Sequence, residues 1–147
     1  MVIYLDTSSL VKLYVEEEYS QKVVDLVRSS TVTATSLVAY AEARAAFARR
    51  FMEKAFTPDE YGRLIASFNE DWENYLLVQV TKELVRLAGD LAEKHGLRGF
   101  DAIHLSSAVS LRRELSGSVI FSCSDQKLQK ASQIEDLNQP EQYLYAR

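Results

Sequence analysis

The sequence predicts an α/β fold built on a parallel sheet that helices cover on both faces. Short apolar segments rich in β-branched residues alternate along the chain with longer segments whose apolar residues recur every three or four positions. Strands and helices in alternation favour parallel strands joined by right-handed crossovers, which place helices on both sides of a sheet. The 147 residues contain no internal repeat or linker, so we expect one domain over 1–147.

In the first half of the chain, strands and helices follow one another closely. Residues 2–6 form a short apolar run, typical of a strand buried on both faces. Thr7, Ser8 and Ser9 supply hydroxyls that cap a helix, and residues 31–35 alternate β-branched and small side chains. We therefore expect strands at 2–6 and 31–35, a short helix through residues 10–14, a helix after Ser20, and an alanine-rich helix over 37–56.

The second half begins with a strong helix start at Thr57-Pro58-Asp59-Glu60, which combines a cap, a first-turn proline and a capping-box glutamate. A second helix begins after Thr81 and stops at His95-Gly96, where glycine is a common terminator. We expect the remaining elements to be strands at 76–80 and 119–123, helices at 101–114 and 125–132, and an edge strand at 134–137.

Composition limits the class of protein and the kind of metal site. Hydrophobic residues make up 47% of the chain and charged residues 26%, which are ordinary globular values. Cys123 is the single cysteine, which excludes an internal disulfide and a thiolate zinc cage. His95 and His104 are the two histidines, so a histidine-rich zinc site is not expected. Any metal would therefore be held by oxygen.

Charge and hydropathy indicate where the protein acts. A net charge of -4 does not indicate a protein that coats nucleic acid through bulk charge. The N-terminus lacks the basic and apolar regions of a signal peptide, and no segment approaches the length of apolar sequence that a membrane span requires. We expect a soluble, cytoplasmic protein without a membrane partner.

Four carboxylates lie against segments expected in the core rather than on a solvated face. Asp6 and Asp125 each follow a strand, Asp101 begins a helix, and Glu42 lies in the first two turns of the helix after the second strand. In open parallel sheets, sites form beyond the carboxyl ends of the strands. All four acids are therefore compatible with one pocket.

Each acid also has a purely structural explanation. Asp6, Asp101 and Asp125 could each cap the helix that follows. Glu42 fits that explanation least, because its neighbours three and four residues away on the helix, such as Ala39 and Ala46, are apolar. A carboxylate on such a face is either near the core or functional, and we favour function.

Electrostatics restricts what a cluster of these acids can be. Two carboxylates about 4 Å apart repel by roughly 4 kcal/mol at an effective dielectric near 20, against a total domain stability of about 5–15 kcal/mol. Protons or a divalent cation must relieve that repulsion. Ligands that are all oxygen suit Mg²⁺ or Mn²⁺, and such an ion can activate water for displacement at phosphorus.

Other polar residues near the acids have two interpretations each. Ser8, Ser36 and Ser124 could bind outer waters or ligand oxygens, although caps and turns explain them better. His104 follows Asp101 by three residues and could be a general acid or base, but we favour a structural partner of the neighbouring acid. The basic residues Arg44, Arg49, Arg50 and Lys54, with Arg112 and Arg113, could form solvated helix faces or a strip that steers phosphates.

Four short motifs follow one another along the chain, each around one of the four acids. The first is the run from Ile3 to Tyr14, IYLDTSSLVKLY. The later motifs are AEAR around Glu42, LRGFDAIHL around Asp101, and SCSDQKL around Asp125. Together they cover nearly the whole chain, and in this order they resemble the PIN domain family, especially VapC-type toxins.

The resemblance implies a PIN-like three-layer α/β/α sandwich with a central, mainly parallel sheet of four or five strands. It also implies a Mg²⁺- or Mn²⁺-dependent endoribonuclease in which Asp6, Glu42, Asp101 and Asp125 form the metal-binding quartet and Ser8 lies near the metal. Proteins of this type are typically homodimers, neutralised by a small VapB-like antitoxin that lies across the groove. On this interpretation Arg44, Arg49 and Arg50 position the RNA backbone.

Two alternatives to a nuclease remain at the level of sequence. A PIN-like module could bind RNA or a protein without cutting, although a site without catalytic activity has no physical reason to keep four mutually repelling acids. A phosphatase that forms an aspartyl-phosphate would be expected to carry Asp-x-Asp after the first strand, but residue 8 is Ser8.

Overall fold

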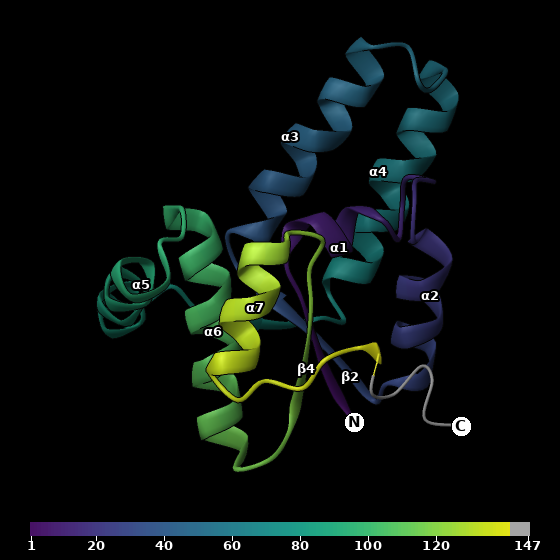
Figure 1. Cartoon of the computed structure of the whole chain (residues 1–147). Coiled ribbons are helices and arrows are strands. Elements are labelled where there is room, and N and C mark those ends of the chain that lie inside the picture. The colour runs from purple at the N-terminus through teal and green to yellow at the C-terminus, as the bar shows by residue number, and fades with distance from the viewer. Residues whose placement is uncertain (142–147) are drawn as a thin grey trace.

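A computed structural model describes residues 1–141 and contains a four-stranded sheet with the strand order β3-β2-β1-β4 (Figure 1). Every neighbouring pair of strands is parallel, as predicted. The central strand β1 pairs with β2 through Val2–Val32 and with β4 through Val2–Val119. The strands are β1 Val2–Leu5, β2 Val32–Ser36, β3 Leu76–Val78 and β4 Val119–Ser122.

Helices pack on both faces of this sheet and make the three layers that the sequence predicts (Figure 1). Ile3, Leu5 and Ile120 point into a core shared with α1 to α4. Tyr4 and Phe121 point the other way, into a core shared with α5, α6 and α7. The helices are α1 Thr7–Val11, α2 Ser20–Ser29, α3 Ala39–Met52, α4 Pro58–Trp72, α5 Lys82–His95, α6 Gly99–Leu115 and α7 Gln126–Ile134.

The helices α3 and α4 extend together beyond the end of the sheet (Figure 1). Thr57 and Glu60 form the capping box expected at the start of α4, with hydrogen bonds of 3.1 and 2.8 Å. Phe47 from α3 meets Phe68 from α4 edge to face, at 5.2 Å between ring centroids. Because Phe47 and Phe68 are fully buried, this aromatic contact fixes α3 and places Glu42 and the arginines at one edge of the molecule.

One expected element is absent from the described part of the chain. Instead of an edge strand at 134–137, α7 continues to Ile134 and the chain then turns. Its backbone pairs with the sheet at one bridge, in which Asn138 lies beside Ile120 of β4. Periodicity over so short a segment does not separate a strand from the end of a helix, which explains the error.

The described residues also bear on two broader predictions. None of the helices within 1–141 is long and apolar enough to cross a membrane. Residues 142–147 of the predicted domain lie outside the described part, so a single domain over 1–147 stays a prediction.

Candidate active site

The four acids lie on elements that meet at the carboxyl edge of the parallel sheet. Asp6 directly follows β1 and Asp125 follows the end of β4 by three residues. Glu42 occupies the first turn of α3, the helix after β2, and Asp101 occupies the first turn of α6. The alternation of strands and helices therefore brings these acids to one edge of the molecule, as the sequence predicts.

Asp6 is a buried carboxylate, 5% exposed, that caps α1. Its Oδ1 accepts hydrogen bonds from the Ser9 backbone nitrogen at 3.0 Å and from the Ser8 hydroxyl at 2.7 Å. Burial raises the pKa of Asp6, and the charge of Asp101 raises it further, while His104 and the two hydrogen bonds oppose the rise. Asp6 therefore caps α1, but its negative charge remains unfavourable in this buried position.

Glu42 is held by two side chains from other elements. Its Oε1 accepts a hydrogen bond from the Thr7 hydroxyl at 2.6 Å and another from Nε2 of His104 at 2.9 Å. Burial disfavours the ionised form of Glu42, yet the hydrogen bonds from His104 and Thr7 prevail and lower its pKa. Glu42 is thus kept ionised and fixed in orientation.

The histidine that holds Glu42 is itself fixed by a buried tyrosine. His104 is 2% exposed, and its Nδ1 lies 2.7 Å from the hydroxyl of Tyr4, which is fully buried. A carboxylate only accepts hydrogen bonds, so the Nε2 that faces Glu42 carries a proton. We expected His104 to partner the neighbouring acid Asp101. The structure gives it a structural role as expected, but its partner is Glu42, because the histidine side chain turns toward α3.

The pKa of Asp101 is raised by burial and by the charges of two of the other acids. Burial raises the pKa most, followed by the charge of Asp125 and, more weakly, that of Glu42, against the opposing charges of His104 and Arg98. The N-cap of α6 is Arg98 rather than Asp101, so capping does not explain the acid. Asp125 does cap α7, accepting a hydrogen bond from the Leu128 backbone nitrogen at 2.8 Å.

In three of the acids, the two carboxylate oxygens differ in their hydrogen bonding. Asp6, Glu42 and Asp125 each place one oxygen in protein hydrogen bonds, and within 1–141 no hydrogen bond reaches the other. No group of three or more acids, histidines or cysteines in this range is tight enough to enclose a metal ion by itself. Mg²⁺ is usually bound through one or two carboxylates together with waters and phosphate oxygens, so a site for it does not require such a group.

Ser8 and Ser124 connect the acids to a cation that the sequence reasoning missed. The Ser124 backbone nitrogen donates to the Ser8 hydroxyl at 3.2 Å, and Nζ of Lys12 donates to the Ser124 hydroxyl at 2.9 Å. Lys12 belongs to the first motif, but nothing in the sequence indicates that it lies beside Ser124. Ser36 accepts from the Val38 backbone nitrogen at 3.3 Å, so it stabilises a turn.

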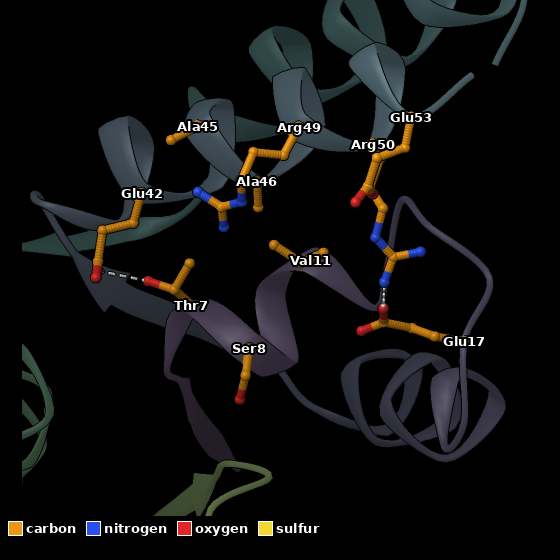
Figure 2. Close-up of a pocket in the computed structure, with 10 residues that line it drawn as sticks. All are labelled: Thr7, Ser8, Val11, Glu17, Glu42, Ala45, Ala46, Arg49, Arg50 and Glu53. Atoms are coloured by element: carbon orange, nitrogen blue, oxygen red, sulfur yellow. Dashed lines mark hydrogen bonds and ion pairs between the residues drawn. The ribbon is translucent and has the colours of Figure 1, made fainter. Parts of the chain in front are cut away.

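A groove of about 580 Å³ runs between α1 and α3, and Glu42, Arg49 and Arg50 all line it (Figure 2). Arg49 and Arg50 extend from α3 on the same side as Glu42. Arg44 does not line this groove, because its guanidinium donates a hydrogen bond to the Tyr40 hydroxyl at 2.7 Å. The expected basic strip is therefore reduced here to two arginines.

Comparisons with known proteins agree with this fold and site. A family model for the PIN domain matches residues 3–133. Ribonuclease VapC45 of Mycobacterium tuberculosis (strain CDC 1551 / Oshkosh) is 34% identical over 114 residues, which cover 75% of this chain and 76% of that protein. Ribonuclease VapC46 of Mycobacterium tuberculosis (strain ATCC 25618 / H37Rv) is 35% identical over 113 residues, with coverages of 77% and 78%. The chain belongs to the PIN domain family.

Solved structures of low sequence identity share the fold. FitAcB from Neisseria gonorrhoeae aligns with a TM-score of 0.62 at 15% identity, covering 93% of this chain and 95% of that one. VapBC-1 from nontypeable Haemophilus influenzae aligns with a TM-score of 0.61 at 17% identity, with coverages of 95% and 96%. These alignments extend over nearly the whole chain, as the sequence motifs do.

Proposed function

We propose that this PIN-domain protein is a Mg²⁺- or Mn²⁺-dependent endoribonuclease that acts as the toxin of a VapBC-type toxin–antitoxin pair. The observation that carries the proposal is the position of Asp6, Glu42, Asp101 and Asp125 at one edge of the sheet, where burial and neighbouring acids raise the pKa of Asp6 and of Asp101. Curated relatives above 30% identity are named as VapC ribonucleases, which supports RNA as the substrate.

In this proposal Asp6, Glu42 and Asp101 are the main metal ligands, and Asp125 binds directly or through water. A divalent ion held by these residues would supply a water activated for attack on phosphorus and would stabilise the charge that develops there. The protein orients the carboxylate oxygens of these ligands. Thr7 and His104 hold one oxygen of Glu42, so its other oxygen is presented in a defined direction.

Ser8 and the α1 backbone do the same for Asp6, whose Oδ1 takes both of their hydrogen bonds. Burial of this carboxylate against the sheet keeps it from turning out to solvent. The raised pKa values of Asp6 and Asp101 are the electrostatic cost of that arrangement, and a cation at the site would relieve it.

Arg49 and Arg50 are proposed to contact the RNA backbone along the groove. Both line the groove together with Glu42, and guanidinium groups match phosphate oxygens in geometry and charge. Reversing the charge at Arg49 and Arg50 should weaken binding of single-stranded RNA and flatten its salt dependence, by about 0.7 in log–log slope for each phosphate that is no longer neutralised. Unchanged binding would remove these arginines from the interface.

The proposal also assigns partners and a compartment. Solved structures with the same fold include toxin–antitoxin complexes, among them VapBC2 from Rickettsia felis bound to a promoter DNA fragment. By analogy, a small VapB-like antitoxin lies across the groove and a homodimer of this chain acts in the cytoplasm. Co-expression with the product of a neighbouring small reading frame, followed by size-exclusion chromatography, tests both the antitoxin and the dimer.

One assay separates a nuclease from a PIN-like module that binds RNA or protein without cutting. Single-stranded RNA is incubated with the protein and Mg²⁺ or Mn²⁺, beside the Asp6→Asn variant and a sample containing EDTA. We expect cleavage by the wild-type protein alone, and only with metal. Equal cleavage by Asp6→Asn would exclude this site, and binding without cleavage would favour the module.

A further inference from the structure

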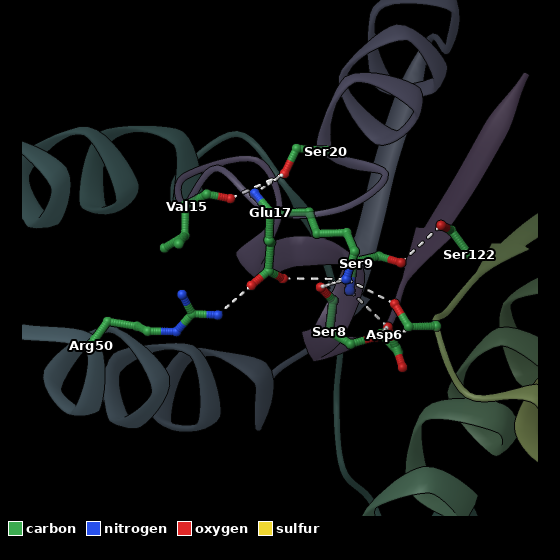
Figure 3. A network of polar contacts seen from close by, with 10 residues as sticks. Asp6, Ser8, Ser9, Val15, Glu17, Ser20, Arg50 and Ser122 are labelled. Carbon is green, nitrogen blue, oxygen red and sulfur yellow. Dashed lines mark hydrogen bonds and ion pairs between the residues drawn. The ribbon is translucent and has the colours of Figure 1, made fainter. Parts of the chain in front are cut away.

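Glu17 holds two cations that come from different helices. Its Oε1 lies 3.3 Å from Nζ of Lys12, the residue that ends α1, and its Oε2 lies 2.5 Å from the guanidinium of Arg50 on α3. Figure 3 shows Arg50 reaching across to the Glu17 carboxylate. One carboxylate therefore occupies the space between an ammonium and a guanidinium.

This carboxylate is not needed to form the loop in which it lies. Glu17 is in the segment between α1 and α2, and the loop is closed through its backbone. The Glu17 backbone nitrogen donates to the Ser20 hydroxyl at 3.0 Å, and the Ser20 backbone nitrogen donates to the Glu17 carbonyl at 3.1 Å. The Ser20 hydroxyl in turn donates to the Val15 carbonyl at 3.1 Å. Replacing the side chain of Glu17 leaves these hydrogen bonds in place.

Both cations are connected to the proposed site, Lys12 through hydrogen bonds and Arg50 through the groove. Nζ of Lys12 donates to the Ser124 hydroxyl, and the Ser124 backbone reaches Asp6 through the Ser8 hydroxyl. The Lys12 side chain is 10% exposed, so its ammonium is held in place rather than free in solvent. Glu17 and Arg50 line the same groove as Glu42 (Figure 2).

We propose that Lys12 and Arg50 form a subsite for an RNA backbone phosphate, and that Glu17 holds this subsite in the free protein and leaves it when RNA binds. The inference rests on the proposed function, because it assigns the subsite to the substrate of that site. A carboxylate resembles a phosphodiester in its negative charge and in its two acceptor oxygens. The contacts that Glu17 makes with Lys12 and Arg50 are those that a phosphate would make.

Removing the carboxylate of Glu17 should change RNA binding more than it changes stability. The ion pair with Arg50 is partly exposed and stabilises the fold little, and Lys12 keeps its hydrogen bond to Ser124 without Glu17, so removing Glu17 should not greatly change the unfolding temperature. Removing it should instead free two cations for phosphate. Glu17→Gln should therefore bind RNA more tightly than the wild-type protein, with a steeper salt dependence.

The test measures binding of a short fluorescein-labelled single-stranded RNA by anisotropy, in EDTA so that no cleavage occurs, over a series of salt concentrations. Glu53→Gln is the matched control, because Glu53 lines the same groove and the substitution changes the net charge equally, but no ion pair of Glu53 exists within residues 1–141. Glu17→Gln should bind about two- to fivefold more tightly than Glu53→Gln. Its salt slope should be steeper by about 0.7 at most, because the subsite takes one phosphate.

A double substitution assigns the gain to the subsite. Adding Glu17→Gln to Arg50→Gln should give a smaller gain than adding it to the wild-type protein, because one of the two cations is then missing. The proposal is overturned if Glu17→Gln binds no more tightly than Glu53→Gln, if the gain is the same without Arg50, or if Glu17→Gln does not bind RNA measurably. Because no cleavage is measured, these outcomes are separate from the Asp6→Asn assay that tests the nuclease.

Discussion

Removing the hydroxyl of Tyr4 should destabilise the protein although it deletes a single atom. Tyr4 lies fully buried in the central strand, and its hydroxyl is 2.7 Å from Nδ1 of His104, which is itself buried. Tyr4→Phe leaves that ring nitrogen without its hydroxyl partner in a place that water does not reach. An unsatisfied buried polar group costs about 1–3 kcal/mol, so the free energy of unfolding should fall by that amount.

Urea denaturation and thermal melting measure this loss. For a domain of this size, each 1 kcal/mol corresponds to a fall of about 2–4 °C in the melting temperature. Tyr61→Phe is the control, because Tyr61 stacks on Phe51 but its hydroxyl makes no hydrogen bond within residues 1–141. Its effect should stay within about 0.5 kcal/mol.

Tyr4→Phe should also lower cleavage of RNA, because His104 orients Glu42 and would lose its hydrogen bond to Tyr4. Cleavage is measured well below the melting temperature of Tyr4→Phe, where the variant is folded, so that a lower rate reports the orientation of Glu42 and not unfolding. Equal unfolding free energies for Tyr4→Phe and Tyr61→Phe would refute the argument that the buried hydroxyl supports the site.

Three further predictions concern stability. Asp101→Asn should abolish cleavage in the presence of metal. In EDTA it should raise the melting temperature, because the raised pKa of Asp101 makes its charge unfavourable in the folded protein. The folded state binds the Asp101 proton more tightly than the unfolded state does. The stability of the wild-type protein should therefore fall as pH rises from the unfolded pKa, about 3.9, through the higher folded pKa. Asp101→Asn should reduce that fall. Asp125→Asn should keep the cap of α7 and its stability but lose activity, whereas Asp125→Ala should cost about 1 kcal/mol in urea melts. Phe68→Ala should cost about 3–5 kcal/mol in the same melts, because the ring is fully buried between helices.

The strands and helices could be predicted because the pattern of buried apolar residues in each segment determines which of the two it forms. Each expected strand before residue 134 is present, with ends that differ by one or two residues. The alanine-rich helix begins at Ala39 rather than residue 37, because Ser36 and Val38 form a turn that periodicity does not reveal. The expected edge strand failed for a related reason, since the contact of Asn138 with β4 depends on tertiary structure.

The candidate site was predictable in its acids but less so in their partners. A carboxylate beside an apolar run is visible in the sequence, and Asp6, Asp101 and Asp125 all lie at element boundaries. The partners of these groups come from distant segments. Tyr4 and His104 are separated by 100 residues, and Lys12 and Ser124 by 112. No local pattern indicates such pairs, so the roles of Tyr4 and Lys12 became apparent only in the folded chain.

The most direct test of the central claim is the effect of Mn²⁺ on the thermal stability of the wild-type protein and of Asp101→Asn. Asp59→Asn, which neutralises an exposed acid at the start of α4, is the charge control. A ligand that binds only the folded state raises its melting temperature. We predict a rise with Mn²⁺ for the wild-type protein and Asp59→Asn, and a much smaller rise for Asp101→Asn. The same rise in all three proteins, or no rise in any, would contradict the claim that these acids share a divalent cation.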